Sequence, residues 1–319
     1  LFSDSVYIDR LSRIPAVMEM PYNDIIRKFI DMYAGRLRNQ VSFMLSACNF
    51  YMPIFEEALD AYGLPLELRY LPIIESALNP SAVSRAGASG LWQFMIGTGK
   101  IYGLESNSLV DERRDPIKAT WAAARYLKEM YDIYGDWNLV IAAYNCGPGT
   151  INKAIRRANG ETDYWKIYNY LPKETRGYVP AFIAANYVMT YYCDHNICPM
   201  ETNIPASTDT VQVNKNLHFE QIADLCNVPL DQIKSLNPQY KKQIIPGDNK
   251  PYTLRLPIEA ISTFIDRQDT IFAHRADELF RNRKTVAVKE ISPSTRRATT
   301  AVAGKGKPTY YKIKSGDTL

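Results

Sequence analysis

The chain has 319 residues, of which 46% are hydrophobic and 23% charged, and its formal net charge at pH 7 is +4. This length supports one substantial domain with a smaller one, or two or three modest ones, and the composition is that of a globular protein. No run of about 18 apolar residues occurs, which argues against a membrane-spanning helix.

The first two hundred residues have the apolar spacing of successive helices. These patterns cover residues 23–34, 41–63, 115–135, 137–145 and 181–192. Glycines and prolines separate the segments, and Asp115 followed by Pro116 is a typical helix start. We therefore predict that the first domain is all-α.

The composition changes after Pro205. Residues 210–257 begin and end with short alternating strands around two helical patterns, which predicts a compact β-α-α-β unit. Residues 267–319 carry 12 Lys and Arg against 5 Asp and Glu, and we interpret them as a helical tail to about Lys289 and then a solvated basic linker. Nucleic-acid binding is the alternative. We do not expect it, because no aromatic residue interleaves with these charges between Phe280 and Tyr310.

Cysteine and histidine show no metal-site pattern. The five cysteines are Cys48, Cys146, Cys193, Cys198 and Cys226, and they lack the pair spacing of zinc ligands, while the three histidines do not cluster. We expect no metal and no cofactor. Cys193 and Cys198 are close enough in sequence for a local disulfide in an oxidising compartment, and two free thiols are an equal alternative.

One acid, Glu75, stands in the otherwise apolar or small segment 71–80. On a helix from about 65 to 78, three leucines would share its face, namely Leu68, Leu71 and Leu78. A carboxyl that points into such surroundings has a raised pKa and stays protonated near neutral pH, as a general acid requires. The alternative is a structural glutamate paired with Arg69 or Arg85.

Two later segments favour a sugar-binding cleft. Residues 84–104 place Gly87 and Gly90 ahead of an aromatic and amide cluster, where a backbone could approach a ligand closely and Gln93 could bond sugar hydroxyls. Residues 142–151 end one helix, turn through Gly-Pro-Gly and begin another. Either segment alone is also compatible with ordinary helix punctuation.

Taken together, these segments resemble the lysozyme-like lytic murein transglycosylases. Four patterns of that family occur in order, as Glu75-Ser76, Gly90-Leu91-Trp92-Gln93-Phe94, Ala143-Tyr144-Asn145-Cys146-Gly147 and Thr175-Arg176-Gly177-Tyr178-Val179. The resemblance covers about residues 55–195 and is closest to the membrane-bound transglycosylase D type. Cys146 is a departure, because the family more often has Ala or Ser there.

The resemblance implies a lysozyme-like fold and a function. These enzymes cut the β-1,4 bond between N-acetylmuramic acid and N-acetylglucosamine in peptidoglycan without water, leaving 1,6-anhydromuramyl products. By carry-over, Glu75 is the catalytic acid and then the base. The implied substrate-binding residues are Ser76, Ser89, Gly90, Gln93, Phe94, Tyr144, Asn145 and Tyr178.

A single carboxylate is enough for this chemistry. Most glycosidases need two, but no second acid lies inside the four motifs, and the acids of residues 111–115 read as an exposed, paired helix start. A substrate-assisted route uses the acetamido group and the C6 hydroxyl of the sugar instead. A hydrolytic muramidase and a non-catalytic wall-binding protein are the two alternatives.

The C-terminal regions resemble LysM modules, which bind chains that contain N-acetylglucosamine. We expect an N-terminal helical segment at 1–54 packing on a catalytic domain at 55–205, a diverged LysM-like domain at 206–260, a helical tail and linker at 261–308, and the start of a truncated LysM domain at 309–319. A small packing domain that binds no glycan is the alternative for 206–260.

The implied substrate also sets the expected location and partners. No signal peptide opens the chain, and Leu1 suggests a mature or trimmed form. We expect a monomer in the periplasm or cell envelope that binds peptidoglycan strands and no nucleic acid. Association with the outer membrane through a removed N-terminal anchor is left open.

Overall fold

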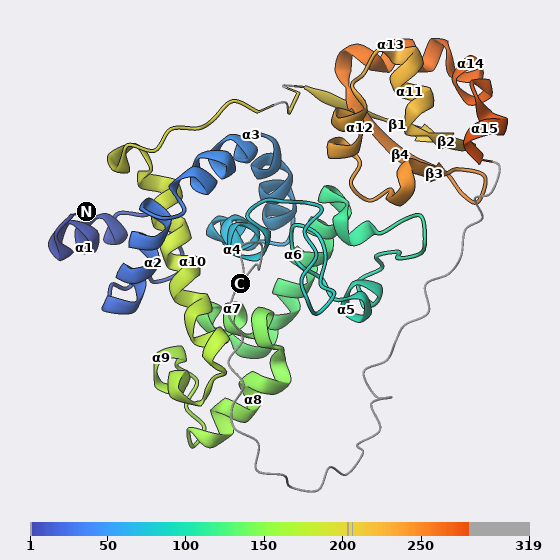
Figure 1. The fold of residues 1–319 in the computed structure, drawn as a ribbon. Coiled ribbons are helices and arrows are strands. Elements are labelled where there is room, and N and C mark those ends of the chain that lie inside the picture. The colour runs from blue at the N-terminus through green and yellow to red at the C-terminus, as the bar shows by residue number, and fades with distance from the viewer. Residues whose placement is uncertain (1, 203, 206, 281–319) are drawn as a thin grey trace, which may run out of the picture. The chain divides into compact units, whose positions relative to one another are not determined.

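The computed structural model describes residues 2–202, 204–205 and 207–280. Up to residue 195 the chain is helical (Figure 1). The α-helices there are α1 (Asp4–Ser12), α2 (Asp24–Ala34), α3 (Arg38–Ala61), α4 (Leu71–Ser76), α5 (Ile96–Ile101), α6 (Pro116–Tyr134), α7 (Trp137–Cys146), α8 (Pro148–Arg157), α9 (Tyr164–Ile167) and α10 (Lys173–Tyr191). Short 3₁₀ turns are η1 (Leu66–Tyr70), η2 (Glu112–Arg114), η3 (Tyr168–Tyr170) and η4 (Cys193–His195). The prediction of a mainly helical first domain is confirmed.

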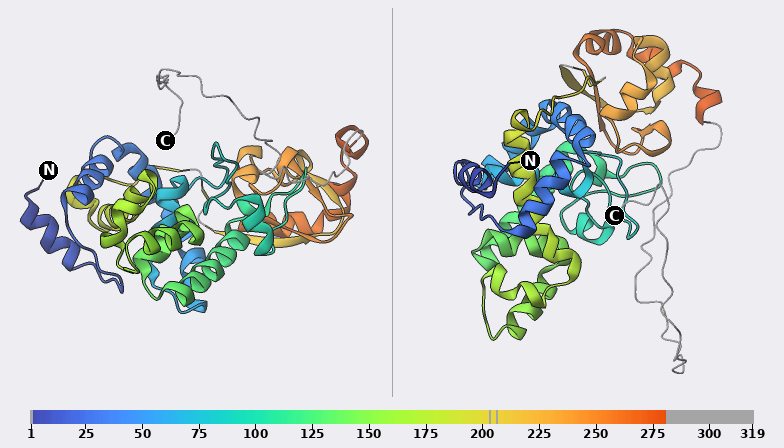
Figure 2. Two further views of the ribbon diagram at one scale, coloured as in Figure 1. Left: turned by 90° about the horizontal axis from the view of Figure 1, so that it is seen from below. Right: turned by 60° about the vertical axis from the view of Figure 1, so that its left-hand side comes forward.

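One hydrophobic cluster unites these helices. α10 packs against α2 and α7, and α3 packs against α6 (Figure 1; Figure 2). Tyr7 of α1, Ile30 of α2 and Phe55 of α3 are fully buried in the same cluster as Trp92. The apolar faces of the first two helices are therefore part of the same core as the segment that carries the motifs.

Helix α6 begins as the sequence predicted. The side chain of Asp115 accepts hydrogen bonds from the backbone N–H groups of Ile117 and Lys118, both at 3.0 Å. Pro116 occupies the first helical position, where its missing N–H costs nothing. The next helix, α7, has a similar cap, since Asp136 accepts from the N–H of Leu139 at 2.8 Å.

Helix α10 is longer than predicted. The apolar pattern covered 181–192, whereas the helix starts at Lys173 and contains Pro180. A proline inside a helix leaves the carbonyl four residues earlier without its usual donor. That carbonyl belongs to Arg176, and the hydroxyl of Tyr164 donates to it at 2.9 Å. This replacement bond lets the helix continue through the proline.

A second, smaller hydrophobic cluster is formed mainly by residues 207–280, together with Leu109 and Val110. Its elements are β1 (Thr208–Val213), β2 (Asn216–His218), α11 (Phe219–Cys226), α12 (Leu230–Leu236), η5 (Lys241–Gln243), β3 (Ile244–Pro246), β4 (Tyr252–Pro257), α13 (Ile258–Asp266), α14 (Gln268–Ala273) and α15 (Ala276–Phe280). β1 pairs antiparallel with β4, from Thr208 opposite Pro257 to Val213 opposite Tyr252. The predicted β-α-α-β unit is therefore present, and α12 and α13 pack against β4 (Figure 1).

Two features of this region were not predicted. β2 and β3 form a second antiparallel pair, which was missed because each strand has only three residues. Phe264 and Ile271, beyond the expected end at 260, are buried in the same cluster as Val213. The predicted tail between 281 and Lys289, the basic linker and the truncated module at 309–319 lie outside the described residues.

Among the described helices, none is both long and apolar enough to cross a bilayer. The described residues include all five cysteines, and each is a free thiol, which favours the free-thiol alternative for Cys193 and Cys198.

Candidate active site

Glu75 lies at the end of α4, where the backbone reverses. Ala77 and Leu78 adopt left-handed φ values of 51° and 58°, which end the helix. The predicted continuous helix over 65–78 is therefore wrong, since a 3₁₀ turn precedes α4 and Leu78 lies beyond it. Leu68, Leu71 and Leu78 are nevertheless buried. Glu75 itself is partly exposed, and apolar residues near it in the chain are buried.

The environment of Glu75 favours its protonated form. Burial raises the pKa of Glu75 to about 7, the hydrogen bond from Tyr178 opposes the rise, and the charge of Glu174 adds to it. No described Lys or Arg pairs with this carboxyl, and Arg69 pairs with Glu56 instead. The alternative of a structural ion pair is therefore wrong.

Two tyrosines adjoin the carboxyl. The hydroxyl of Tyr178 donates to Oε1 of Glu75, and that of Tyr144 donates to the backbone oxygen of Trp92 at 2.7 Å. Burial raises the pKa of both phenols well above the usual value, and the charge of Glu75 raises it further. Both groups stay protonated at neutral pH, so Tyr178 can orient the carboxylate and Tyr144 can hold the neighbouring turn in place.

Asn145 joins two of the motif segments. It stands near the end of α7, one residue after Tyr144, and its side-chain oxygen accepts a hydrogen bond from the hydroxyl of Thr175 at 2.9 Å. Gly147 then turns the chain into α8 with a positive φ of 80°. The third and fourth motifs are therefore brought together, as the resemblance implied.

Three of the proposed binding residues turn out to be internal supports. Ser89 is fully buried, and its hydroxyl accepts from Nε of Arg114 at 3.0 Å. A Cβ on Gly90 would lie 1.8 Å from the backbone oxygen of Arg113, so this glycine permits close packing of the chain on itself. Phe94 is 3% exposed in the core. The expectation of substrate contacts through the side chains of Ser89 and Phe94 is corrected, because both side chains are buried. A backbone contact at Gly90 stays a prediction.

Gln93 and Ser76 remain partly exposed. Nε2 of Gln93 donates to the backbone oxygen of Gly90 at 2.8 Å, while no described donor reaches its side-chain oxygen. The hydroxyl of Ser76 lies 3.0 Å from the backbone oxygens of both Pro72 and Leu91. Gln93 therefore offers an acceptor to a ligand, whereas Ser76 ties α4 to the motif turn.

The acids of residues 111–115 are not exposed as expected. Asp111 and Glu112 are 1% and 4% exposed. Asp111 bonds Arg113 with two contacts of 2.8 Å, and Glu112 pairs with Lys118. The prediction that they are paired is correct, and their burial gives them a structural role.

The sequence analysis did not predict Glu174 as a residue of the site. It immediately precedes Thr175 of the fourth motif, and its charge contributes to the raised pKa of Glu75. The available signal was this position next to the motif, at the start of the helix that carries Tyr178.

Comparisons with known proteins found family models and relatives that match this chain. The family model described as a transglycosylase SLT domain matches residues 52–167, and the model described as the LysM-like domain of lytic transglycosylase MltD matches residues 207–273. Membrane-bound lytic murein transglycosylase D of Escherichia coli strain K12 is 30% identical over 308 residues, which are 95% of this chain. The chain spans 63% of the length of that relative.

Other relatives match a smaller part of the chain. The soluble lytic murein transglycosylase of Escherichia coli strain K12 is 33% identical over 124 residues, covering 37% of this chain and 19% of the relative. The solved 70 kDa soluble lytic transglycosylase of Escherichia coli matches 45% of this chain and 24% of that chain, with 29% identity and a TM-score of 0.39. By the family models, residues 52–167 are a transglycosylase SLT domain, and residues 207–273 are a LysM-like domain of the kind described for lytic transglycosylase MltD.

Proposed function

We propose that the chain is a lytic transglycosylase that cleaves the β-1,4 bond between N-acetylmuramic acid and N-acetylglucosamine in peptidoglycan and leaves 1,6-anhydromuramyl ends. The observation that carries this proposal is Glu75, a partly buried carboxyl with a pKa of about 7 and no basic partner among the described residues. Near neutral pH such a group is protonated in a large fraction of molecules and can also act as a base.

In the first step, protonated Glu75 donates its proton to the oxygen that leaves with N-acetylglucosamine. The bond from that oxygen to C1 of the muramyl unit breaks, and the acetamido carbonyl of the same unit stabilises the positive charge that develops at C1. The hydrogen bond from Tyr178 then stabilises the carboxylate that Glu75 has become.

In the second step, the Glu75 carboxylate accepts the proton of the C6 hydroxyl of the muramyl unit. The C6 oxygen bonds to C1 and closes the 1,6-anhydro ring, so the proton count of the enzyme is restored. The nucleophile belongs to the same sugar, and no bound water or second carboxylate is needed.

Mass spectrometry of muropeptides released from purified sacculi tests this proposal. We expect 1,6-anhydromuramyl fragments, each lighter by one water than the hydrolytic product. Reducing muramic acid ends as the main product would overturn the proposal and favour a muramidase.

The domain boundaries are also proposals. The shared core supports a catalytic unit at 55–205 with residues 1–54 packed on it. The second hydrophobic cluster, whose members after residue 205 run from Val213 to Ile271, supports a diverged LysM-like domain beginning near 206 and extending past 260 to at least Ile271. We propose that this domain binds glycan, and binding of the catalytically inactive Glu75→Gln chain to chitin oligomers is the test.

We further propose that the protein works in the periplasm or cell envelope, where peptidoglycan lies, and that it does so as a monomer. Fractionation of cells and light scattering of the purified chain test these two statements. Association with the outer membrane is tested by the same fractionation, with recovery in the soluble fraction as the contrary result.

A further inference from the structure

A basic cavity lies beside the catalytic motifs and is not used by the chemistry above. Its volume is about 390 Å³. The residues that line it are Thr150, Lys153, Arg157, Asn169, Tyr170, Leu171, Pro172 and Arg176. Three of them are cations and none is an acid, so the lining carries three positive charges.

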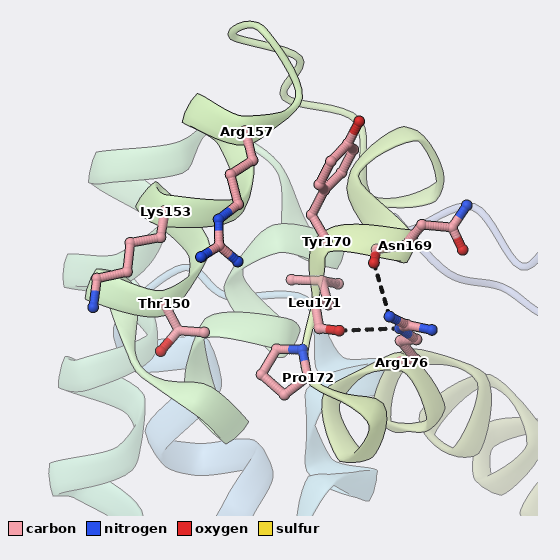
Figure 3. Close-up of a pocket in the computed structure, with 8 residues that line it drawn as sticks. All are labelled: Thr150, Lys153, Arg157, Asn169, Tyr170, Leu171, Pro172 and Arg176. Carbon is pink, nitrogen blue, oxygen red and sulfur yellow. Dashed lines mark hydrogen bonds between the residues drawn. The ribbon is translucent and has the colours of Figure 1, made fainter.

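The Arg176 side chain in this cavity is held in place by hydrogen bonds. Its Nε donates to the backbone oxygen of Leu171 at 3.0 Å, and its Nη2 donates to that of Asn169 at 2.8 Å (Figure 3). The backbone of Arg176 is held as well, because its carbonyl accepts from Tyr164 in place of the donor that Pro180 lacks. These partners are neutral, so the guanidinium charge has no described counter-ion.

Lys153 and Arg157 line the opposite side, on α8. They are four residues apart, and like charges at this spacing on a helix repel each other. Neither forms a hydrogen bond or ion pair with any described residue. An exposed lysine nearby behaves differently, since Lys166 pairs with Glu161 at 3.0 Å. An anion between Lys153, Arg157 and Arg176 would relieve this repulsion.

The cavity is close in the chain to the groups that hold the catalytic acid. Arg176 lies between Thr175, which bonds Asn145, and Gly177, which precedes the Tyr178 partner of Glu75. Thr150 lies in the first turn of α8, directly after the turn that follows α7. The segments that line the cavity are thus continuous with those that hold Glu75, and a peptide of four extended residues spans roughly 14 Å.

We propose that this cavity binds a carboxylate of the short acidic peptide that peptidoglycan carries on its muramyl unit. The inference rests on the proposed function, because that function brings a muramyl unit to Glu75. Arginine binds carboxylates with paired N–H donors, and lysine adds a compact positive charge. The cavity thereby selects strands that carry peptide over bare glycan.

The first experiment compares two substrates. The Lys153→Gln/Arg157→Gln variant is assayed for kcat/KM on glycan strands that carry peptides and on the same strands after an amidase has removed the peptides. We expect a loss of about tenfold or more on the first substrate and less than twofold on the second. Arg156→Gln is the matched control, because Arg156 is a neighbouring exposed arginine of α8 outside the cavity, and it should change neither rate.

Equal losses on the two substrates, or no loss on either, would overturn the inference. Circular dichroism melting of the double variant must match that of the Arg156→Gln chain, which separates a binding effect from unfolding.

A second experiment measures binding without catalysis. Calorimetry of the Glu75→Gln chain with a soluble muramyl tetrapeptide should show binding that weakens at least fivefold when the peptide carboxyls are amidated, or when Lys153 and Arg157 are replaced by Gln. Unchanged affinity in both cases would overturn the inference. Because this assay needs no turnover, it decides the inference even if product analysis disproves the transglycosylase reaction.

Discussion

Two sets of acids in this chain have opposite environments. Asp111 is 1% exposed and bonded to Arg113 by two contacts of 2.8 Å, with Lys241 3.8 Å away. Glu75 is partly exposed, has no described basic partner, and receives a hydrogen bond from Tyr178. A buried acid with matched cations has a structural role, whereas an acid that lacks them can gain and lose a proton near neutral pH.

The largest effect should follow from removing the exchangeable proton. Glu75→Gln keeps the volume of the side chain and should lower the rate of cleavage of sacculi by about 10³-fold or more, because both the acid and the base role are lost. Folding should be retained, as checked by circular dichroism. Substantial residual turnover would show that another acid does the chemistry.

Asp111→Asn should lower the stability of the fold. Removing one partner of a buried ion pair leaves an uncompensated charge on Arg113, and the free energy of unfolding should fall by about 3–5 kcal/mol. Urea titration measures this loss, while the rate per folded molecule should stay within about twofold. Asp9→Asn is the control, because Asp9 pairs with Arg13 on the surface and should cost less than about 1 kcal/mol. A folded but inactive Asp111→Asn chain would contradict the structural role.

The stability of the chain should also depend on pH through Glu75. Its folded pKa of about 7 exceeds the ordinary value of 4.5, so its contribution to stability is present below pH 4.5 and is lost as pH rises through 7. Glu75→Gln lacks this loss and should be more stable than the parent at pH 8, by up to about 3 kcal/mol, and equal to it near pH 4. Unfolding curves of both chains at the two pH values check this. A difference in the free energy of unfolding that is the same at pH 4 and pH 8 would contradict the prediction.

Gln93→Ala and Tyr144→Phe should each lower turnover by about 10- to 1000-fold, the range for one positioned hydrogen bond in a site that excludes water. Gln93 offers the acceptor that reaches toward substrate, and Tyr144 fixes the turn at Trp92. Steady-state kinetics on intact sacculi measure both. If both variants match the parent, the cleft has been placed wrongly.

The smallest expected effects are opposite shifts of one pH profile. Glu174→Gln removes a charge that raises the pKa of Glu75, so the alkaline limb of kcat/KM should move to lower pH. Tyr178→Phe removes a bond that lowers this pKa, so the limb should move to higher pH. A severe loss of rate at every pH in Glu174→Gln would instead identify a second catalytic carboxylate.

The sequence predicted those features that depend on neighbouring residues. Helices α3 and α6 follow from apolar spacing, and the cap of α6 follows from Asp115 and Pro116. The pattern could not show that α10 continues through Pro180, because that depends on a hydrogen bond from the distant Tyr164.

The candidate site was predictable to a similar degree. The motif pattern located Glu75 and Tyr178, which the structure brings together. It could not distinguish residues that face a ligand from residues that support the turn, which is why Ser89 and Phe94 were misplaced. The basic cavity depends on three separate segments and has no signature in any one of them.

The most direct test of the contrast between these acids is a measurement of the Glu75 pKa. Carbon-13 NMR of the carboxyl groups in uniformly labelled chain, with Glu75→Gln used to assign the signal, reports this titration. We expect a midpoint near pH 7 for Glu75 in the folded protein. A midpoint at or below the ordinary value of 4.5 would mean that the carboxyl is held as an anion, and would contradict its assignment as the proton donor.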